Sequence, residues 1–217
     1  MGSVSSDANA RGSGPAPAEQ ASAPRLGRRE RRDRILAAAT QAFARAGFAA
    51  TSLDDVAREA GITRVLLYRH FESKADLYRA VLERAQRRLA EATGVPPFTD
   101  ASIDGLLAAA AGDPDGFRLL FHHAAREPEF RAEMARFRAG VIDVTFGQLA
   151  ALVSDPAWAR WAAQLVSTVA VEGVTAWLDA GQPDPETAAE RLRQAIAGVI
   201  HAAAQRETTA SRSNPCD

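Results

Sequence analysis

Two short amphipathic segments joined by a glycine constrain the fold of this chain more than any other feature. Between residues 53 and 60 apolar side chains recur at helical spacing, and Gly61 ends that segment. Ser52 and Asp55 have the spacing of a capping box at its start, and Thr63 can cap a second helix over about 64–70. A helix, a glycine turn and a short helix are the arrangement of a helix-turn-helix, in which the second helix enters the major groove of DNA.

The rest of the sequence predicts an all-α chain of about nine helices. Alanine is abundant, aromatic residues make up 6% of the chain, and the alternation typical of strands is scarce. Glycine or proline marks most of the breaks, and an aspartate before proline at 113, 155 and 184 predicts a helix cap. The predicted helices cover 28–46, 52–60, 64–70, 74–93, 100–111, 114–125, 128–153, 156–180 and 185–206.

The two ends of the chain, its single cysteine and its lack of long apolar runs bear on the expected cellular location. Residues 1–27 are rich in Ser, Gly and Pro and predict a disordered tail, and residues 207–217 predict a frayed one. Cys216 is the only cysteine, which excludes an intrachain disulfide and a multi-cysteine metal site. No apolar run approaches the roughly 20 residues of a membrane span, and no export signal is apparent. We expect a cytoplasmic protein associated with the nucleoid.

Charge is distributed unevenly along the chain. Residues 28–93 hold 14 Lys and Arg against 9 Asp and Glu, a net charge of +5, whereas residues 94–217 hold 10 against 16, a net charge of −6. Five arginines gather between Arg28 and Arg34. A basic end on an acidic body favours contact with a polyanion, although solvated helix faces are the alternative explanation.

Within the second helix of the motif, helical geometry separates buried from outward positions. Leu67 and Phe71 lie four residues apart and are expected to pack, with Ile62, against the preceding helices. The outward or flanking positions are Arg64, Val65, Leu66, Tyr68, Arg69 and His70.

Several of these side chains have the chemistry of a DNA contact. Arg64 can bond guanine in a bidentate manner, and Val65 and Leu66 can touch thymine methyl groups. Tyr68 and His70 can donate to phosphates. The candidate DNA-binding residues are Ser52, Thr63, Arg64, Val65, Leu66, Tyr68, Arg69, His70 and Lys74. The alternatives are that Tyr68 and His70 lie at the edge of the core, that the arginines are solvated charges, and that Lys74 pairs with an acid.

The runs TSLDDVAREAGITR at 51–64 and LYRHFESKADL at 67–77 resemble the signature of the TetR family of transcriptional regulators. The resemblance implies an Ω-shaped, all-α homodimer with an N-terminal three-helix DNA-binding domain and a C-terminal helical domain for ligand binding and dimerisation. It divides this chain into residues 28–73 and 74–206, with phosphate contacts at Ser52, Tyr68, His70 and Lys74. Base-reading positions fall on Arg64, Val65 and Leu66. Val65 and Leu66 are bulkier than usual for the family, so no operator sequence is carried over.

Two helices are candidates for the dimer interface that the resemblance implies, 156–180 and 185–206. The first has a stripe of mostly small residues, which suits close helix packing: Ala159, Ala163, Val166, Ala170, Gly173 and Trp177. The second has a wide apolar face from Ala188 to Ala203. From the residues alone, packing inside the chain is an equal alternative.

A ligand pocket is expected between the helices that contain residues 114–180, with an apolar lining and a few polar groups. The candidate lining residues are Phe117, Phe121, His122, Phe137, Val141, Trp161, Leu165, Thr168 and Glu172. The alternatives are that the aromatic residues form core and that Glu172 faces solvent or pairs with an arginine. His122 and His123 point about 100° apart on a helix and cannot share a metal ion.

The sequence therefore predicts a dimeric regulator, most simply a repressor, that binds a palindromic operator in double-stranded DNA and is released by a small-molecule inducer. The alternatives are an activator and a DNA-binding protein controlled by a protein partner. No catalytic triad, phosphate-binding loop or metal-ligand spacing supports an enzyme, and no cofactor is expected.

Overall fold

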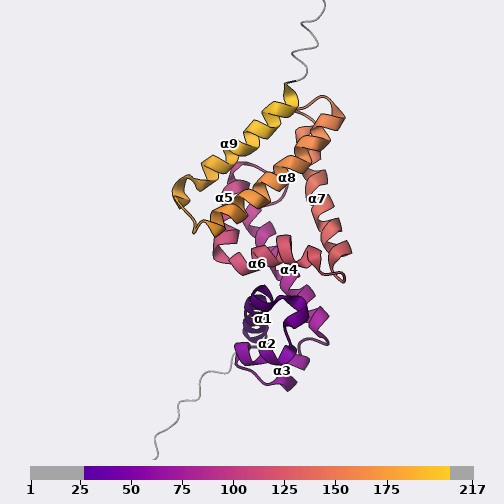
Figure 1. Cartoon of the computed structure of the whole chain (residues 1–217), viewed down its shortest axis with the longest axis vertical. Helices are drawn as coiled ribbons and strands as arrows, with labels where there is room; N and C mark the ends of the chain where they lie inside the picture. The colour runs from indigo at the N-terminus through magenta and orange to yellow at the C-terminus, as the bar shows by residue number, and fades with distance from the viewer. Residues whose placement is uncertain (1–26, 206–217) are drawn as a thin grey trace, which may run out of the picture.

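The computed structural model describes residues 27–205, and this part of the chain is all-α (Figure 1). The predicted tails are residues 1–27 and 207–217 with Cys216, and they lie outside the described residues except for Gly27, the N-cap of α1. The helices are α1 (Arg28–Ala50), α2 (Leu53–Ala60), α3 (Arg64–Tyr68), α4 (Lys74–Thr93), α5 (Asp100–Gly112), α6 (Pro114–Arg118), the π-helix η1 (Leu119–His123), the 3-10 helix η2 (Ala124–Arg126), α7 (Arg131–Leu149), α8 (Pro156–Asp179) and α9 (Pro185–Ala204).

The first four helices begin and end where local chemistry dictates. The start of a helix leaves backbone N–H groups without partners inside the helix. The side chains of Ser52, Thr63 and Ser73 each accept a hydrogen bond from one such group, at the starts of α2, α3 and α4. Gly61 ends α2 with φ of 64°, a left-handed conformation that glycine adopts without a steric penalty. Helix α1 has a kink at Gly47, where φ is 78° and where the sequence predicts a break.

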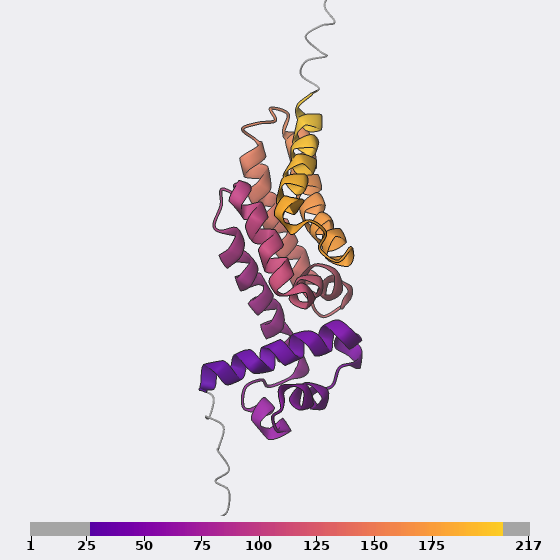
Figure 2. The same ribbon diagram turned by 90° about the vertical axis from the view of Figure 1, so that its left-hand side faces the viewer.

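The molecule has a small lower part and a larger helical body. Helices α1, α2 and α3 form the lower part, and α4 runs from it into the body (Figure 1). Seen from the side, α1 lies crosswise beneath the body helices (Figure 2). In the body, α8 lies between α9 and α7 (Figure 1). The fold thus presents α2 and α3 at one end, away from the body.

An aromatic cluster joins the lower part to the body. The ring of Tyr78 lies 4.8 Å from that of Phe43, 5.0 Å from Phe48 and 4.7 Å from Phe130, measured between centroids. We call these four residues the aromatic junction. Because Phe43 and Phe48 belong to α1, Tyr78 to α4 and Phe130 to the turn before α7, one hydrophobic core runs from the lower part into the body.

The segment after Pro114 departs from the single helix predicted over 114–125. It changes from α6 to the π-helix η1, where the N–H of Ala124 bonds the carbonyl of Leu119, and then to η2. Helix α7 starts at Arg131 and ends at Leu149, inside the predicted range. Asp113 and Asp155 cap their helices as predicted, but Asp184 does not, because its φ of 42° leaves its carboxylate without a capping hydrogen bond.

The small-residue stripe assigned to dimer contacts on α8 packs inside the chain. Ala159 and Ala163 are fully buried, and both belong to a core that includes Ala203 of α9. A Cβ atom on Gly173 would lie 2.9 Å from Leu192 Cδ1, so this glycine permits close packing of α8 on α9. The intrachain alternative is therefore correct for this stripe, and the residues available to a second copy lie on other faces.

Between residues 27 and 205, none of the helices combines the length and the apolar character that crossing a lipid bilayer requires.

Candidate nucleic-acid interface

The short helix α3 has one buried and one open face, as its spacing predicts. Leu67 and Phe71 are buried against α1 and α2, and Ile62 packs against the same core. On the open side, Val65 has 67% of its surface exposed and Tyr68 43%. Leu66 is half-buried, and Arg69 is exposed. The core needs neither side chain, so both are accessible to another molecule.

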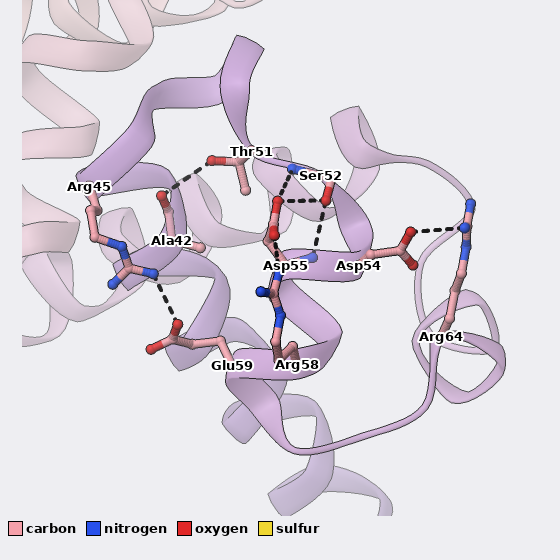
Figure 3. A network of polar contacts seen from close by, with 9 residues as sticks. All are labelled: Ala42, Arg45, Thr51, Ser52, Asp54, Asp55, Arg58, Glu59 and Arg64. Atoms are coloured by element: carbon pink, nitrogen blue, oxygen red, sulfur yellow. Dashed lines mark hydrogen bonds and ion pairs between the residues drawn. The ribbon is translucent and has the colours of Figure 1, made fainter.

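Arg64 connects α3 to the start of α2. Its Nη1 donates to Asp54 Oδ2 at 2.9 Å (Figure 3), and its Nη2 donates to the Tyr68 hydroxyl at 3.3 Å. The guanidinium also lies 5.5 Å from the centroid of the Tyr68 ring. The hydrogen bond with Tyr68 and the charge of Asp54 raise the pKa of Arg64. The predicted base-reading arginine is thus held by two specific partners, and one of them, Asp54, belongs to the preceding helix α2 and was not among the predicted site residues.

Ser52 is committed to the capping box at the start of α2. Its hydroxyl accepts from the Asp55 N–H at 3.1 Å and donates to Asp55 Oδ2 at 2.6 Å, and Arg58 pairs with the same carboxylate (Figure 3). The hydrogen bonds from Ser52 and then the charge of Arg58 lower the pKa of Asp55. A phosphate contact from the Ser52 hydroxyl therefore requires it to turn away from Asp55. Thr63, by contrast, only accepts in its own cap and keeps its hydroxyl proton for another acceptor.

Within residues 27–205 Lys74 has no acidic partner, in contrast to the alternative that it pairs with an acid. Its Nζ donates to the carbonyl oxygens of Phe48 and Ala49 at 2.9 and 3.2 Å and lies 4.6 Å from the centroid of the Phe48 ring. An ammonium group has three donors, so one remains for a phosphate.

His70 lies next to the basic start of α1. Arg32 places its guanidinium 4.9 Å from the ring centroid of Phe71, the neighbour of His70. Burial lowers the pKa of His70, and the positive charges of Arg28, Arg31 and Arg32 lower it further. The arginine cluster at the start of α1 and the end of α3 therefore form one positively charged surface, which is consistent with the charge gradient along the sequence.

In the body, three of the candidate pocket residues form an aromatic row. The rings of Phe117 and Phe121 lie 4.8 Å apart and those of Phe121 and Phe137 lie 6.1 Å apart. His122 Nε2 contacts the Thr175 hydroxyl at 2.8 Å, and its Nδ1 lies 4.0 Å from Glu172. Since Thr175 donates its own proton to the Val171 carbonyl, it accepts from His122. Val141 and Leu165 are half-buried.

Three other candidate lining residues lie at the surface of the single chain. Trp161 is 42% exposed, Thr168 is exposed, and the Glu172 side chain is 60% exposed, so all three lie on an outward face of α8. A cavity in the body, lined in part by Phe117, Leu89 and Leu120, measures about 20 Å³. That is room for about one water molecule. The spacing of residues along α8 separates two faces of the helix, but it does not indicate which of them packs against other helices of the same chain.

Within the region that the structure describes, no group of three or more His, Cys, Asp or Glu side chains is arranged so that it could hold a metal ion.

Comparison with known proteins identifies the class. Residues 35–81 match the family model described as bacterial regulatory proteins, tetR family. The chain is 30% identical over 189 residues to the transcriptional activator FasR of Mycolicibacterium smegmatis, which covers 82% of this chain and 86% of FasR. It is 33% identical over 120 residues to the transcriptional repressor SCO4008 of Streptomyces coelicolor, covering 49% of this chain and 62% of that protein.

A solved structure shares the fold. The TetR-like transcriptional regulator from Rhodococcus sp. RHA1 superposes with a TM-score of 0.69 at 24% identity, over 79% of this chain and 96% of that one. The fold and the exposed short helix define a helix-turn-helix DNA-binding protein. The chain belongs to the TetR family and is a transcriptional regulator, not an enzyme. Regulators of this family bind operator DNA and function as dimers.

Proposed function

We propose that this protein is a repressor that binds a palindromic operator as a homodimer and leaves it when a small molecule binds the body. The observation that carries the proposal is the open face of α3, where Val65 and Tyr68 are exposed beside a basic surface. Repression is the simpler mode, since a protein bound over a promoter blocks it without further contacts. The proposed place of action is the nucleoid in the cytoplasm.

The proposed DNA interface places α3 in the major groove. Val65, Leu66 and Arg64 face the base edges, while Tyr68, His70 and Arg69 face phosphates. The outer rim consists of Ser52, Thr63 and Lys74, with the arginines at the start of α1 reaching along the backbone. Phosphate contacts position the protein and base contacts select the sequence.

The proposed dimer forms through outward faces of α8 and α9. On α8 the exposed residues Trp161, Gln164, Thr168, Glu172 and Ala176 follow helical spacing. On α9 the exposed residues Ala195, Gly198 and Ala202 are small and allow close approach. Pairing these faces between two copies covers the Trp161 ring and places two α3 helices on one DNA duplex. In dimers of helix-turn-helix proteins the two recognition helices lie about one DNA turn, roughly 34–36 Å, apart.

The proposed effector site is the aromatic row of Phe117, Phe121 and Phe137 with His122 at its polar end. The cavity of about 20 Å³ near Phe117 is too small for an effector. The ligand must therefore separate the helices around the row, and this movement is what would change the spacing of the α3 helices.

The test begins with selection of bound duplexes from a random DNA pool by the full-length protein. We expect an enriched palindrome bound by two copies. Tyr68→Phe should weaken binding to every sequence by about 3- to 10-fold for one lost hydrogen bond, and it should also lower sequence preference, because the Tyr68 hydroxyl holds Arg64. Arg64→Ala should relax preference at particular base pairs. Recovery of no preferred sequence would contradict the proposal.

The narrow cavity favours a second candidate, control by a protein partner that contacts the body surface. Small-molecule control predicts that a compound raises the melting temperature of the protein and releases it from the selected operator. Release by a cell-extract protein, with no compound that does both, would favour the second candidate. A reporter gene placed behind the selected operator distinguishes repression from activation, which matters because the two named relatives act in opposite directions.

A further inference from the structure

We infer that Asp54 is a specificity-determining residue, which orients Arg64 for base reading by holding its guanidinium at the junction of α2 and α3. The inference rests on the proposed DNA interface and adds to it a residue that does not itself touch a base. The juxtaposition of the two side chains is visible in Figure 3.

The geometry fixes the guanidinium on two sides. Asp54 Oδ2 accepts from Nη1 at 2.9 Å, and the Tyr68 hydroxyl accepts from Nη2 at 3.3 Å. The Tyr68 ring also lies 5.5 Å from the guanidinium carbon. An arginine on a helix surface otherwise samples many rotamers, and the ordering of such a side chain opposes binding. The two partners, Asp54 on α2 and Tyr68 on α3, favour one orientation of the guanidinium before DNA arrives.

The contact leaves the guanidinium able to bind a base. Arginine has five N–H donors, and Asp54 and Tyr68 use one on each terminal nitrogen. One N–H on each of those nitrogens and the Nε–H remain, which suffices for a bidentate contact with guanine. Both side chains are more than half exposed, at 59% for Arg64 and 58% for Asp54. DNA can therefore reach the guanidinium without unfolding the turn.

Stability does not account for the pair. An ion pair this exposed contributes little to folding, because solvent screens it. A carboxylate near the DNA-facing end of α2 also repels phosphates. Its presence beside Arg64 is consistent with a role in selecting among sequences rather than in raising overall affinity.

The experiment is a double-mutant cycle with Asp54→Ala, Arg64→Ala and the pair, on the full-length protein. Affinity is measured for the operator selected from a random pool and for a random-sequence duplex of equal length. We expect Asp54→Ala to lower the ratio of these affinities by about 5- to 10-fold, the lower part of the range for a bidentate base contact. In the Arg64→Ala background the same change should have no effect on the ratio.

Glu59→Ala is the matched control. It also removes an acid from α2 that pairs with an arginine, Arg45, at 2.9 Å, but it does not contact α3. It should raise binding to both duplexes equally. Asp54→Ser keeps a polar side chain at the start of α2 but is too short to reach Arg64, and it is the variant to use if Asp54→Ala does not fold. An unchanged or higher ratio, or additive effects, overturns the inference. Failure of the wild type to select any operator instead overturns the proposed function.

Discussion

The ammonium of Lys74 lies against the end of α1, where it donates to the Phe48 carbonyl at 2.9 Å and stands 4.6 Å from the Phe48 ring centroid. The first residue of α4 thus satisfies carbonyl groups that the break at Gly47 leaves without helical partners. Lys74 is therefore a structural residue as well as a candidate phosphate contact, and the two roles are separable by experiment.

Lys74→Met should lower the free energy of unfolding by about 1–2 kcal/mol, because the part-buried Phe48 carbonyl and the exposed Ala49 carbonyl lose a charged donor. It should also reduce the slope of log affinity against log salt by about 1 for each protomer, if the third donor reaches a phosphate. Urea titration and DNA binding over a range of salt measure the two effects. Arg69→Met is the control, since this exposed side chain should change the salt slope and leave stability within about 0.5 kcal/mol. An unchanged unfolding midpoint would contradict the structural role.

The affinity for operator DNA should rise as the pH falls from 8 to 6, because of His70. In the free protein, burial and the positive charges of Arg28, Arg31 and Arg32 lower its pKa, so His70 is neutral at pH 7. A bound phosphate favours the protonated form and raises that pKa. Binding therefore takes up a proton, and affinity increases by at most about tenfold per pH unit for each His70.

The pH effect is checked by binding titrations at constant salt. His70→Gln keeps a hydrogen-bonding side chain and removes the titration, so its affinity should vary less with pH than that of the wild type. Equal pH dependence of the two proteins would place His70 outside the DNA interface.

Gly105→Ala should destabilise the body by about 1–3 kcal/mol, the usual cost of forcing extra volume into a close contact. A Cβ atom on Gly105 would lie 1.9 Å from the Ala92 carbonyl oxygen, so α5 would have to move away from α4. Thermal unfolding measures the loss. Gly140→Ala is the matched control, because a Cβ atom there meets nothing within 4 Å and alanine favours a helix. Equal melting temperatures for the two variants would contradict the close approach of α4 and α5.

Tyr78→Phe should leave stability unchanged or raise it by about 0.5–1 kcal/mol. Within residues 27–205 the buried Tyr78 hydroxyl has no hydrogen-bond partner, and burial raises its pKa well above the usual value. Removing an unpaired buried hydroxyl relieves a desolvation cost while the ring contacts stay. Urea titration measures the change. A loss of more than about 1 kcal/mol would mean that the hydroxyl has a partner in solution.

Local signals predicted the DNA-binding end well. Capping at Ser52, Thr63 and Ser73 and the break at Gly61 depend on neighbours within four residues, so they can be read directly from the sequence. The burial of Leu67 and Phe71 follows from helical spacing in the same way. These short-range rules also explain why the family signature is compact.

What the sequence could not provide depends on contacts between distant segments. Asp54 meets Arg64 across ten residues and a turn, and no periodicity reports such a pair. Apolar side chains occur on both faces of α8, among them Trp161 on the outward face, so the position of α9 decides that Gly173 faces inward and Trp161 outward. The π-helix at Leu119–His123 arises within an ordinary helical pattern for which no local signal was available.

The aromatic junction of Phe43, Phe48, Tyr78 and Phe130 has a mechanical consequence. Tightly packed rings transmit displacement and do not absorb it. A shift of the turn at Phe130 is therefore passed to α1 and α4 together, and the DNA-reading end turns with the base of the body as one piece. Under the proposed function, a ligand that displaces this turn would therefore move the DNA-reading end together with the base of the body.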